Sequence, residues 1–198
     1  MNNQNIKINA QRLNLLYQER IACLTEMMDE LKEQDEFDIS NIFSIVYNSL
    51  NEMMLFLDGG CLIGIKDDQL NVYACQNIET PENYWIDLPL NKRQQIINEL
   101  ESKSSKEVLF WNYEHNATEN LHLKTENIAL AISLLCNRAD DEKMYIMLFR
   151  NKLNNPFISH EIQLIKIVSR IVGWHLNYEF TYQVLMYQFE KSFRRKLI

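Results

Sequence analysis

Histidines are the residues of this chain that could most readily bind a metal. His115 and His122 lie in one polar stretch, residues 112–126. A structural or catalytic metal needs three or four ligands that converge on one point, and the spacing of these two histidines does not fit a helical pair of ligands. His175 lies among apolar residues of a helical pattern, where a core or interface histidine is the ordinary role. We therefore expect no metal site.

Cysteines are the second group that could carry chemistry. Cys61, Cys75 and Cys136 fall in stretches that read as strands, Cys23 falls in a helical stretch, and no C-x-x-C pair occurs. Scattered cysteines of this kind are typical of reduced thiols that fill a core as small apolar side chains. A thiol enzyme would instead require two cysteines within disulfide reach of each other, one of them partly exposed.

Other catalytic patterns are missing from the sequence. The chain has only 4 glycines and no glycine-rich phosphate loop. It also lacks a G-x-S-x-G elbow, and the acidic run 140–142 is typical of a solvated turn. We expect no catalytic residue and therefore a protein that is not an enzyme.

Composition and charge narrow the class further. The chain has 198 residues, 46% of them hydrophobic, and a formal net charge of −7. It can bury a core, and its charge argues against nucleic acid as a partner. No secretory signal follows Met1 and no apolar run is long enough for a membrane span, so we expect a cytoplasmic protein with no membrane contact.

The order of the predicted elements indicates an α+β fold. Apolar residues recur at helical spacing in four stretches and at strand spacing in five, and residues 85–88 add a short candidate strand. The predicted helices span residues 10–34, 39–54, 91–102 and 159 onward, and the predicted strands span residues 61–66, 70–76, 108–111, 127–137 and 143–150. Consecutive hairpins predict an antiparallel sheet of five to six strands flanked by helices. Asp38 is the expected cap of the second helix, and the run 58–60 (Asp-Gly-Gly) is the strongest turn signal.

The two ends of the chain are predicted to be long helices with narrow apolar stripes. Such stripes suit a seam between helices better than a deep core, so we expect a homodimer whose terminal helices form a coiled-coil-like bundle. The predicted seam residues are Leu13, Leu16, Leu24, Met27, Leu31, Tyr178, Tyr182, Leu185 and Phe189. The corresponding domain division is an N-terminal dimerisation helix over 1–38, a central domain over 39–178 and a helical extension over 179–198.

Three patterns in the central region resemble the GAF domain family. The first is a helix that leads through residues 58–60 into the hairpin CLIGIKDDQLNVYA. The second is the strand pair 127–137 and 143–150, and the third is the closing stretch RNKLNNPFISHEIQLIKIVSRIVGWHLNY over 150–178. The resemblance covers roughly residues 39–178. The layout of GAF domains is similar to that of PAS domains, which stay an alternative. The glycine that the family usually has in its penultimate strand is replaced here by bulkier residues.

The resemblance implies a sensory or regulatory module that binds a small molecule between the sheet and a cover of helix and loop. The implied ligand-binding residues are Trp85, Trp111, Tyr113, His115, His122, Ala129, Ala131 and Ser133. Asn151, Lys152, Phe157 and Glu161 match part of the signature of the cyclic-nucleotide-binding branch. Ile162 interrupts its closing acidic pair, which puts that ligand in doubt.

Three functions therefore remain open. The first is a sensor of an unknown small molecule with no resident cofactor, and the second is a ligand-free scaffold that binds a signalling or regulatory protein. The third is a thiol-based reductase that resembles free methionine sulfoxide reductase. Because the chain starts at Met1 and ends in a helix without an effector domain, we expect any output to pass through another protein.

Overall fold

The computed structural model describes residues 3–34, 36–54, 57–67, 69–77, 94, 97–98, 100, 108–112, 127–134, 142–151 and 157–196. Helices and strands follow one another along the chain in the order expected of an α+β protein, which confirms the predicted class. The elements are α1 (Asn3–Lys32), α2 (Ile39–Met53), β1 (Gly59–Lys66), β2 (Gln69–Gln76), β3 (Val108–Asn112), β4 (Asn127–Leu134), β5 (Lys143–Asn151) and α5 (Ser159–Lys196).

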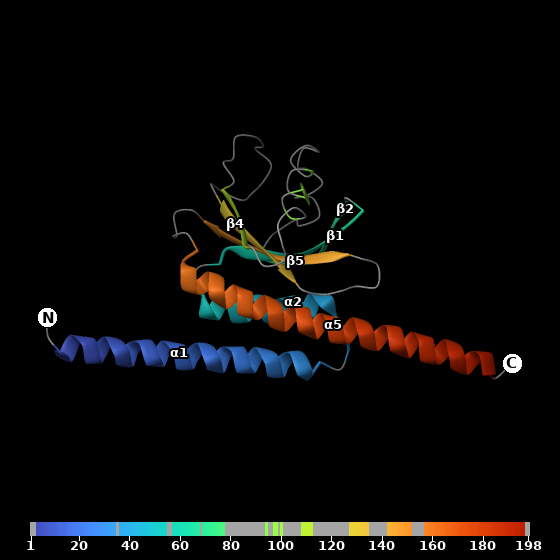
Figure 1. Ribbon diagram of the computed structural model, residues 1–198, viewed down its shortest axis with the longest axis horizontal. Coiled ribbons are helices and arrows are strands. Elements are labelled where there is room, and N and C mark those ends of the chain that lie inside the picture. The colour runs from blue at the N-terminus through green and yellow to red at the C-terminus, as the bar shows by residue number, and fades with distance from the viewer. Residues whose placement is uncertain are drawn as a thin grey trace.

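The strands form one antiparallel sheet in the order β2-β1-β5-β4-β3. Strand β5 lies at the centre of the sheet, between the β1–β2 hairpin and the β4–β3 pair (Figure 1). Both predicted hairpins are therefore confirmed. The sheet brings together segments that lie far apart in the sequence, because β1 pairs with β5 across the middle of the chain.

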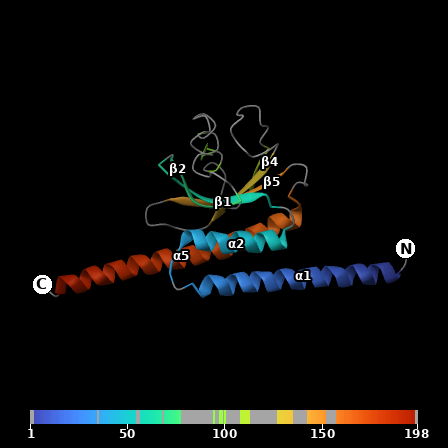
Figure 2. The same ribbon diagram turned by 180° about the vertical axis from the view of Figure 1, so that it is seen from behind.

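The three long helices lie together on one side of the sheet. Helices α2 and α5 contact the strands, and α1 packs against α2 from outside (Figures 1 and 2). The N-terminal half of α1 and the C-terminal half of α5 project beyond the sheet at opposite ends of the molecule. Among the described helices, none has an apolar stretch long enough to cross a membrane.

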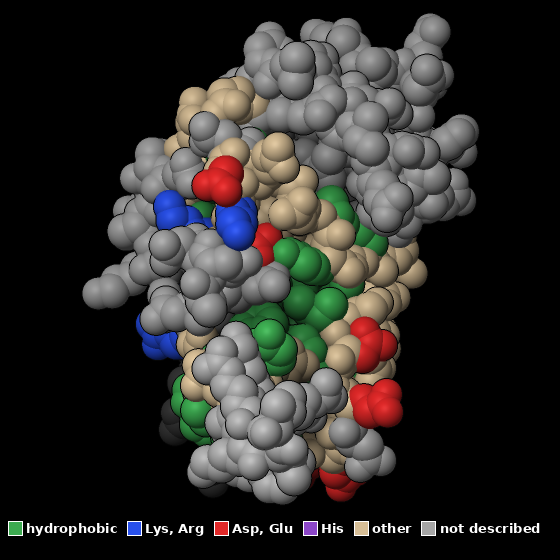
Figure 3. All heavy atoms as spheres, turned by 90° about the vertical axis from the view of Figure 1, so that its right-hand side faces the viewer, with side chains coloured by type: hydrophobic (Ala, Val, Ile, Leu, Met, Phe, Trp, Pro, Cys, Tyr) green, Lys and Arg blue, Asp and Glu red, His purple; other side chains and the backbone are tan. Residues whose placement is uncertain are grey.

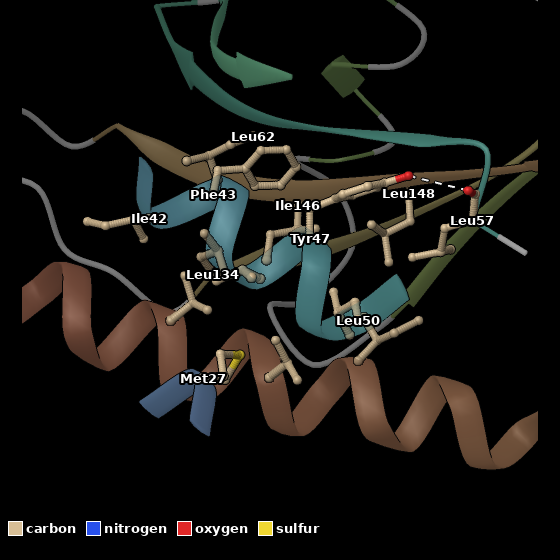
Figure 4. Packing of buried hydrophobic residues seen from close by; sticks show 14 of the residues in the cluster. Met27, Ile42, Phe43, Tyr47, Leu50, Leu57, Leu62, Leu134, Ile146 and Leu148 are labelled. Atoms are coloured by element: carbon tan, nitrogen blue, oxygen red, sulfur yellow. Dashed lines mark hydrogen bonds between the residues drawn. The ribbon is translucent and has the colours of Figure 1, made fainter. Parts of the chain in front are cut away.

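The hydrophobic core lies between the sheet and these helices (Figure 4). Phe43, Tyr47 and Leu50 project from α2 at helical spacing and are buried. Above them lie side chains of β1 and β5, and the Tyr47 hydroxyl donates a hydrogen bond to the Leu57 carbonyl oxygen at 3.3 Å. Asp38 caps α2 as predicted, because its carboxylate accepts a hydrogen bond from the Ser40 N–H at 2.8 Å.

The glycines predicted to form a turn have a different role. Gly59 and Gly60 are the first two residues of β1, and no glycine has a positive φ among the described residues. A Cβ atom at Gly60 would lie 3.1 Å from side-chain atoms of both Tyr47 and Leu148. The absence of a side chain therefore allows α2 to approach the sheet closely, and the prediction of a turn over these two residues was wrong.

Helix α1 is also longer and more deeply packed than predicted. It begins at Asn3 instead of residue 10, and its C-terminal half enters the core. Met27 is 0% exposed and Leu31 is 3% exposed, and both belong to the same buried cluster as α2 and the sheet. The last turns of α1 are therefore part of the central domain, and the predicted division after residue 38 does not separate the packing.

Two adjacent methionines test this packing. Replacing Met27, which is 0% exposed, with alanine should lower the free energy of unfolding by about 2–5 kcal/mol, because a cavity remains in the core. The same change at Met28, which is 37% exposed, should cost less than about 0.5 kcal/mol. Urea unfolding followed by circular dichroism measures both values. Equal small costs would contradict the placement of α1 in the core.

Candidate functional site

The two faces of the sheet have different environments. Gly60 lies against Tyr47 of α2, so even-numbered positions of β1 face the helices. Alternate residues of a strand point to opposite faces, and on the other face the Tyr145 hydroxyl donates to the Leu100 carbonyl oxygen at 3.2 Å. We call this other side, away from α2 and α5, the second face. It includes Cys61, Ile63 and Ile65 of β1, Cys75 of β2, and Tyr145, Met147 and Phe149 of β5.

The strand register relates four predicted ligand-binding residues to this second face. Trp111 pairs with Ala129, and Ala129 pairs in turn with Phe149. In the neighbouring rows, Ala131 pairs with Met147 and Ser133 pairs with Tyr145. The backbone thus places all four predicted residues in the cross-strand rows that contain the buried second-face residues of β5.

The other predicted ligand-binding residues lie outside the described part of the chain. These are Trp85, Tyr113, His115 and His122, and the candidate strand over 85–88 lies outside it as well. Within the described residues, no cluster of three histidine, cysteine or acidic side chains could hold a metal ion. The assignment of these four residues to a pocket stays a prediction.

On the helix-facing side, a buried ion pair links the central strand to α5. The Arg150 guanidinium donates to both carboxylate oxygens of Glu161, at 2.9 and 3.0 Å. The guanidinium also lies over the Phe157 ring, 4.4 Å from its centroid. Arg150 is 2% exposed and Glu161 is 7% exposed, so the pair is shielded from solvent. It joins the end of β5 to the first turn of α5.

The environment of Glu161 holds its carboxyl group in the ionised form. Burial alone would raise its pKa, but hydrogen bonds from Arg150 and the Ile158 N–H, together with the charge of Arg150, outweigh burial. The pKa of Glu161 therefore lies below its ordinary value of 4.5. The N–H of Ile158 donates to the carboxylate at 2.9 Å just before the helix begins. The same side chain thus pairs with Arg150 and caps α5.

Glu142 is a buried acidic residue that the sequence did not reveal. It is 3% exposed, although the acidic run to which it belongs predicted a solvated turn. The Tyr73 hydroxyl contacts its two carboxylate oxygens at 2.5 and 2.6 Å, and the Asn71 side-chain amide donates to one of them at 3.3 Å. A side chain at Gly64 would occupy the space of this carboxylate. The prediction for Glu142 was wrong because its partners lie on β2, far away in sequence.

Two of the predicted strand cysteines lie side by side. Cys61 on β1 and Cys75 on β2 are directly opposite in the antiparallel register. A hydrogen bond with Cys75, together with burial, raises the pKa of the Cys61 thiol well above its ordinary value. Cys23 lies apart, on α1, where burial and nearby Glu52 raise the pKa of its thiol to about 11. Cys136 lies outside the described residues.

The predicted dimer residues fall into three groups. Met27 and Leu31 are buried and Leu24 is half-buried against the core of the same chain, so the first two are not free to contact a second copy in this conformation. The exposed members are Leu16, Tyr178, Tyr182 and Leu185. The side chains of Leu13 and Phe189 lie outside the described residues, although both positions are helical.

The fold is shared with several solved structures of low sequence similarity. The GAF domain of a protein described as a sensor histidine kinase from Pseudomonas syringae pv. tomato has a TM-score of 0.56 and 12% identity, covering 89% of this chain and 99% of that one. The GAF domain of a phosphoenolpyruvate-protein phosphotransferase from Coxiella burnetii has a TM-score of 0.56 and 10% identity, covering 83% and 96%. This chain has a GAF-like fold.

A third similar structure comes from a transcription factor. The N-acylhomoserine lactone dependent LuxR family protein CepR2 from Burkholderia cenocepacia has a TM-score of 0.59 and 11% identity, covering 84% of this chain and 98% of that one. No protein-family model matches the sequence, and no curated protein matches it. The likeness therefore lies in the three-dimensional arrangement of the GAF-like elements.

Acid unfolding tests the buried ion pair of the GAF-like domain. Because the pKa of Glu161 is lower in the folded chain than its ordinary value of 4.5, its stabilisation is full above that value and is lost as the pH falls through the folded pKa. Replacing Glu161 with glutamine should cost about 3–5 kcal/mol at neutral pH, since Arg150 stays buried without a counter-charge. The variant should also lose less stability than the wild type between pH 5 and pH 3.

The matched control for this experiment is Glu30→Gln, because Glu30 is exposed on α1. It should change the free energy of unfolding by less than about 0.5 kcal/mol. Urea titrations at several pH values measure all three proteins. Equal effects of the two substitutions would show that the ion pair does not hold α5 on the sheet.

Proposed function

We propose that this chain is a non-catalytic sensory or regulatory module that acts as a homodimer through its long helices. The GAF-like fold supports the proposal, since similar structures come from proteins described as a sensor histidine kinase and as a lactone-dependent transcription factor. A fold alone does not determine a function. The support specific to this chain is the apolar surface on its two long helices.

The observation that carries the proposal is an exposed aromatic and aliphatic stripe on α5. Trp174 is 74% exposed and Tyr178 is 63% exposed, although both lie on the domain itself. Tyr182 and Leu185 continue the stripe at spacings of four and three residues as α5 leaves the sheet. Exposed apolar side chains in a continuous row on one helix mark an interaction surface. A second copy of the same helix would bury them.

Helix α1 supports the same arrangement. Its apolar stripe is covered by α2 and the core at Met27 and Leu31 but is exposed at Leu16, where the helix projects beyond the sheet. Tyr17 and Ile21 on the same helix are also exposed. Figure 3 shows the molecule from the end at which α5 projects. Hydrophobic side chains gather near the centre of this surface, and acidic side chains lie along one edge. Apolar surface therefore lies at both ends of the helical layer.

The sheet and α5 provide a route from an input to this surface. On β5, second-face residues such as Met147 alternate with helix-facing residues such as Leu148. At the end of the same strand, Arg150 holds Glu161 in the first turn of α5. A small molecule on the second face that displaces β5 would thus displace the start of α5. We propose that the signal leaves the domain as a shift of this helix within the dimer.

A ligand-free scaffold is the second candidate, and the second face itself favours it. Tyr145, Met147 and Phe149 are large and buried on the central strand, as are Ile63 and Ile65 on β1. Bulky side chains of this kind fill, in this alternative, the space above the sheet in which a ligand would otherwise lie. In this alternative, the domain binds a regulatory protein through the same exposed helices and has no small-molecule input.

Two exposed tyrosines of α5 test the dimer. Tyr178→Ala removes an aromatic side chain from the exposed stripe. It should raise the dissociation constant of the dimer at least tenfold, because a few aromatic side chains supply most of the binding energy of an interface. Tyr187, which is 66% exposed compared with 63% for Tyr178, lies on another side of the helix and serves as the control. Sedimentation equilibrium measures both. A wild-type chain that is monomeric at micromolar concentration would refute the dimer.

A bound small molecule separates the sensor from the scaffold. A sensor purified under native conditions should carry mass beyond the 23.6 kDa of the chain that is lost on denaturation, or should be stabilised by an extract of small molecules. A ligand present at 100 times its dissociation constant adds about 2.7 kcal/mol, which corresponds to roughly 5–11 °C in melting temperature for a chain of this size.

Native mass spectrometry and thermal unfolding make these two measurements, with the dialysed extract as control. No excess mass and no shift would leave the scaffold as the supported function. Either result is independent of the oligomeric state, so the sensor and dimer proposals fail or stand separately.

A further inference from the structure

We propose that Cys61 and Cys75 form a reversible dithiol–disulfide site that reacts with hydroperoxides. The two residues are direct partners across the β1–β2 pair, on the second face of the sheet. The site is separate from the dimer surface and from the Arg150–Glu161 ion pair. It gives the domain a redox input that does not depend on whether a small molecule binds.

The backbone places the two sulfur atoms within bonding reach. Directly opposite residues of an antiparallel pair have Cα atoms about 4.5–5.5 Å apart, and disulfides form at Cα separations of about 4.4–6.8 Å. The register shift in this hairpin falls between Leu62 and Ile63, beyond the Cys61–Cys75 pair. The neighbouring Cys75 side chain contributes to the raised pKa of the Cys61 thiol, which agrees with this close pairing. A disulfide therefore requires rotation of the side chains and little movement of the strands.

The two thiols differ in solvent accessibility, and this difference indicates which of them reacts first with the hydroperoxide. β2 is an edge strand of the sheet, and Cys75 on it is only partly buried. Cys61 is on the inner strand β1, is 2% exposed, and has a raised pKa. Thiolates are the reactive form of cysteine. Cys75 is therefore the thiol that meets the oxidant, and Cys61 is the one that resolves the product.

The reaction balances with a hydroperoxide as the oxidant. The Cys75 thiolate attacks the terminal oxygen of ROOH, the O–O bond breaks, and the alkoxide takes up the thiol proton and leaves as ROH. Cys75 is then a sulfenic acid. The Cys61 sulfur attacks the Cys75 sulfur, the S–O bond breaks, and hydroxide leaves as water with the Cys61 proton. Two sulfur atoms are oxidised and the peroxide oxygens are reduced to ROH and water.

The position of the site suggests what oxidation changes. The row of direct partners runs from Cys75 through Cys61 to Met147 on the central strand β5. A disulfide would tie the edge strand to this row and limit its local opening. Cross-strand disulfides that draw two Cβ atoms together beyond their relaxed separation are strained, and strained disulfides are the readily reduced, regulatory ones. Thiol reductants should therefore reverse the oxidation.

The test uses the full-length chain carrying Cys23→Ser, which leaves three of its four cysteines. After treatment with hydrogen peroxide, the number of thiols that react with an alkylating reagent in denaturant should fall from three to one, and the mass should fall by the two hydrogen atoms lost. Peptide mapping should identify a Cys61–Cys75 link, and dithiothreitol should restore all three thiols.

Three further variants in the same background define the controls. Cys61→Ser should leave Cys75 as a sulfenic acid that dimedone captures, while Cys75→Ser should abolish both the disulfide and the dimedone adduct at this site. Cys136→Ser should leave the Cys61–Cys75 link unchanged. Because mapping of the parent protein needs neither site variant, the result stands even if one of them fails to fold.

Two outcomes would overturn the proposal. One is a disulfide that joins Cys75 to Cys136 or to a second chain in place of Cys61. The other is a thiol count that stays at three under peroxide conditions that oxidise free cysteine in the same solution.

Discussion

The packing of this protein depends on one buried charge, the guanidinium group of Arg150. Arg150 is 2% exposed, and burying its guanidinium without a partner would cost several kcal/mol. The partner is Glu161, held by two hydrogen bonds from Arg150 and one from the Ile158 N–H. The ion pair holds the first turn of α5 at the end of β5. The inner stripe of α5 then reaches the core from that point, because Ile165, Val168 and Val172 follow at helical spacing.

The two faces of the sheet thus belong to different layers of the molecule. Its helix-facing side is closed by α2 and α5 around Tyr47, and Gly60 allows the close approach that this requires. Its second face contains the Cys61–Cys75 pair and the large side chains of β5. Because β5 contributes alternate residues to both layers, the signal that we propose would pass from one face to the other through this strand. Strand β5 is also the central strand of the sheet.

The sequence predicted the elements better than the groups that meet between them. Hydrophobic periodicity locates α2, both hairpins and α5, because burial of an apolar face is a local pattern repeated every few residues. The burial of Glu142 left no such pattern, since its partners Tyr73 and Asn71 lie about 70 residues away and meet it only through strand pairing. The Cys61–Cys75 pair lies within one predicted hairpin, so the sequence allowed two cysteines on adjacent strands, but core packing was the expected role of each thiol. Four predicted pocket residues fall in regions outside the described part of the chain.

Helix α1 shows why an apolar stripe alone does not identify a dimer seam. Its stripe is continuous in sequence, yet Met27 is buried in the chain's own core and Leu16 is exposed. The difference arises where the helix passes the end of α2, which only the three-dimensional arrangement reveals. The same reasoning applies to α5, whose inner stripe ends in the core while its outer stripe, at Trp174 and Tyr178, stays exposed over the domain itself. A helix that is packed on one side and exposed on the other can shift against a partner without unfolding the domain, which is the motion that the proposed function requires of α5.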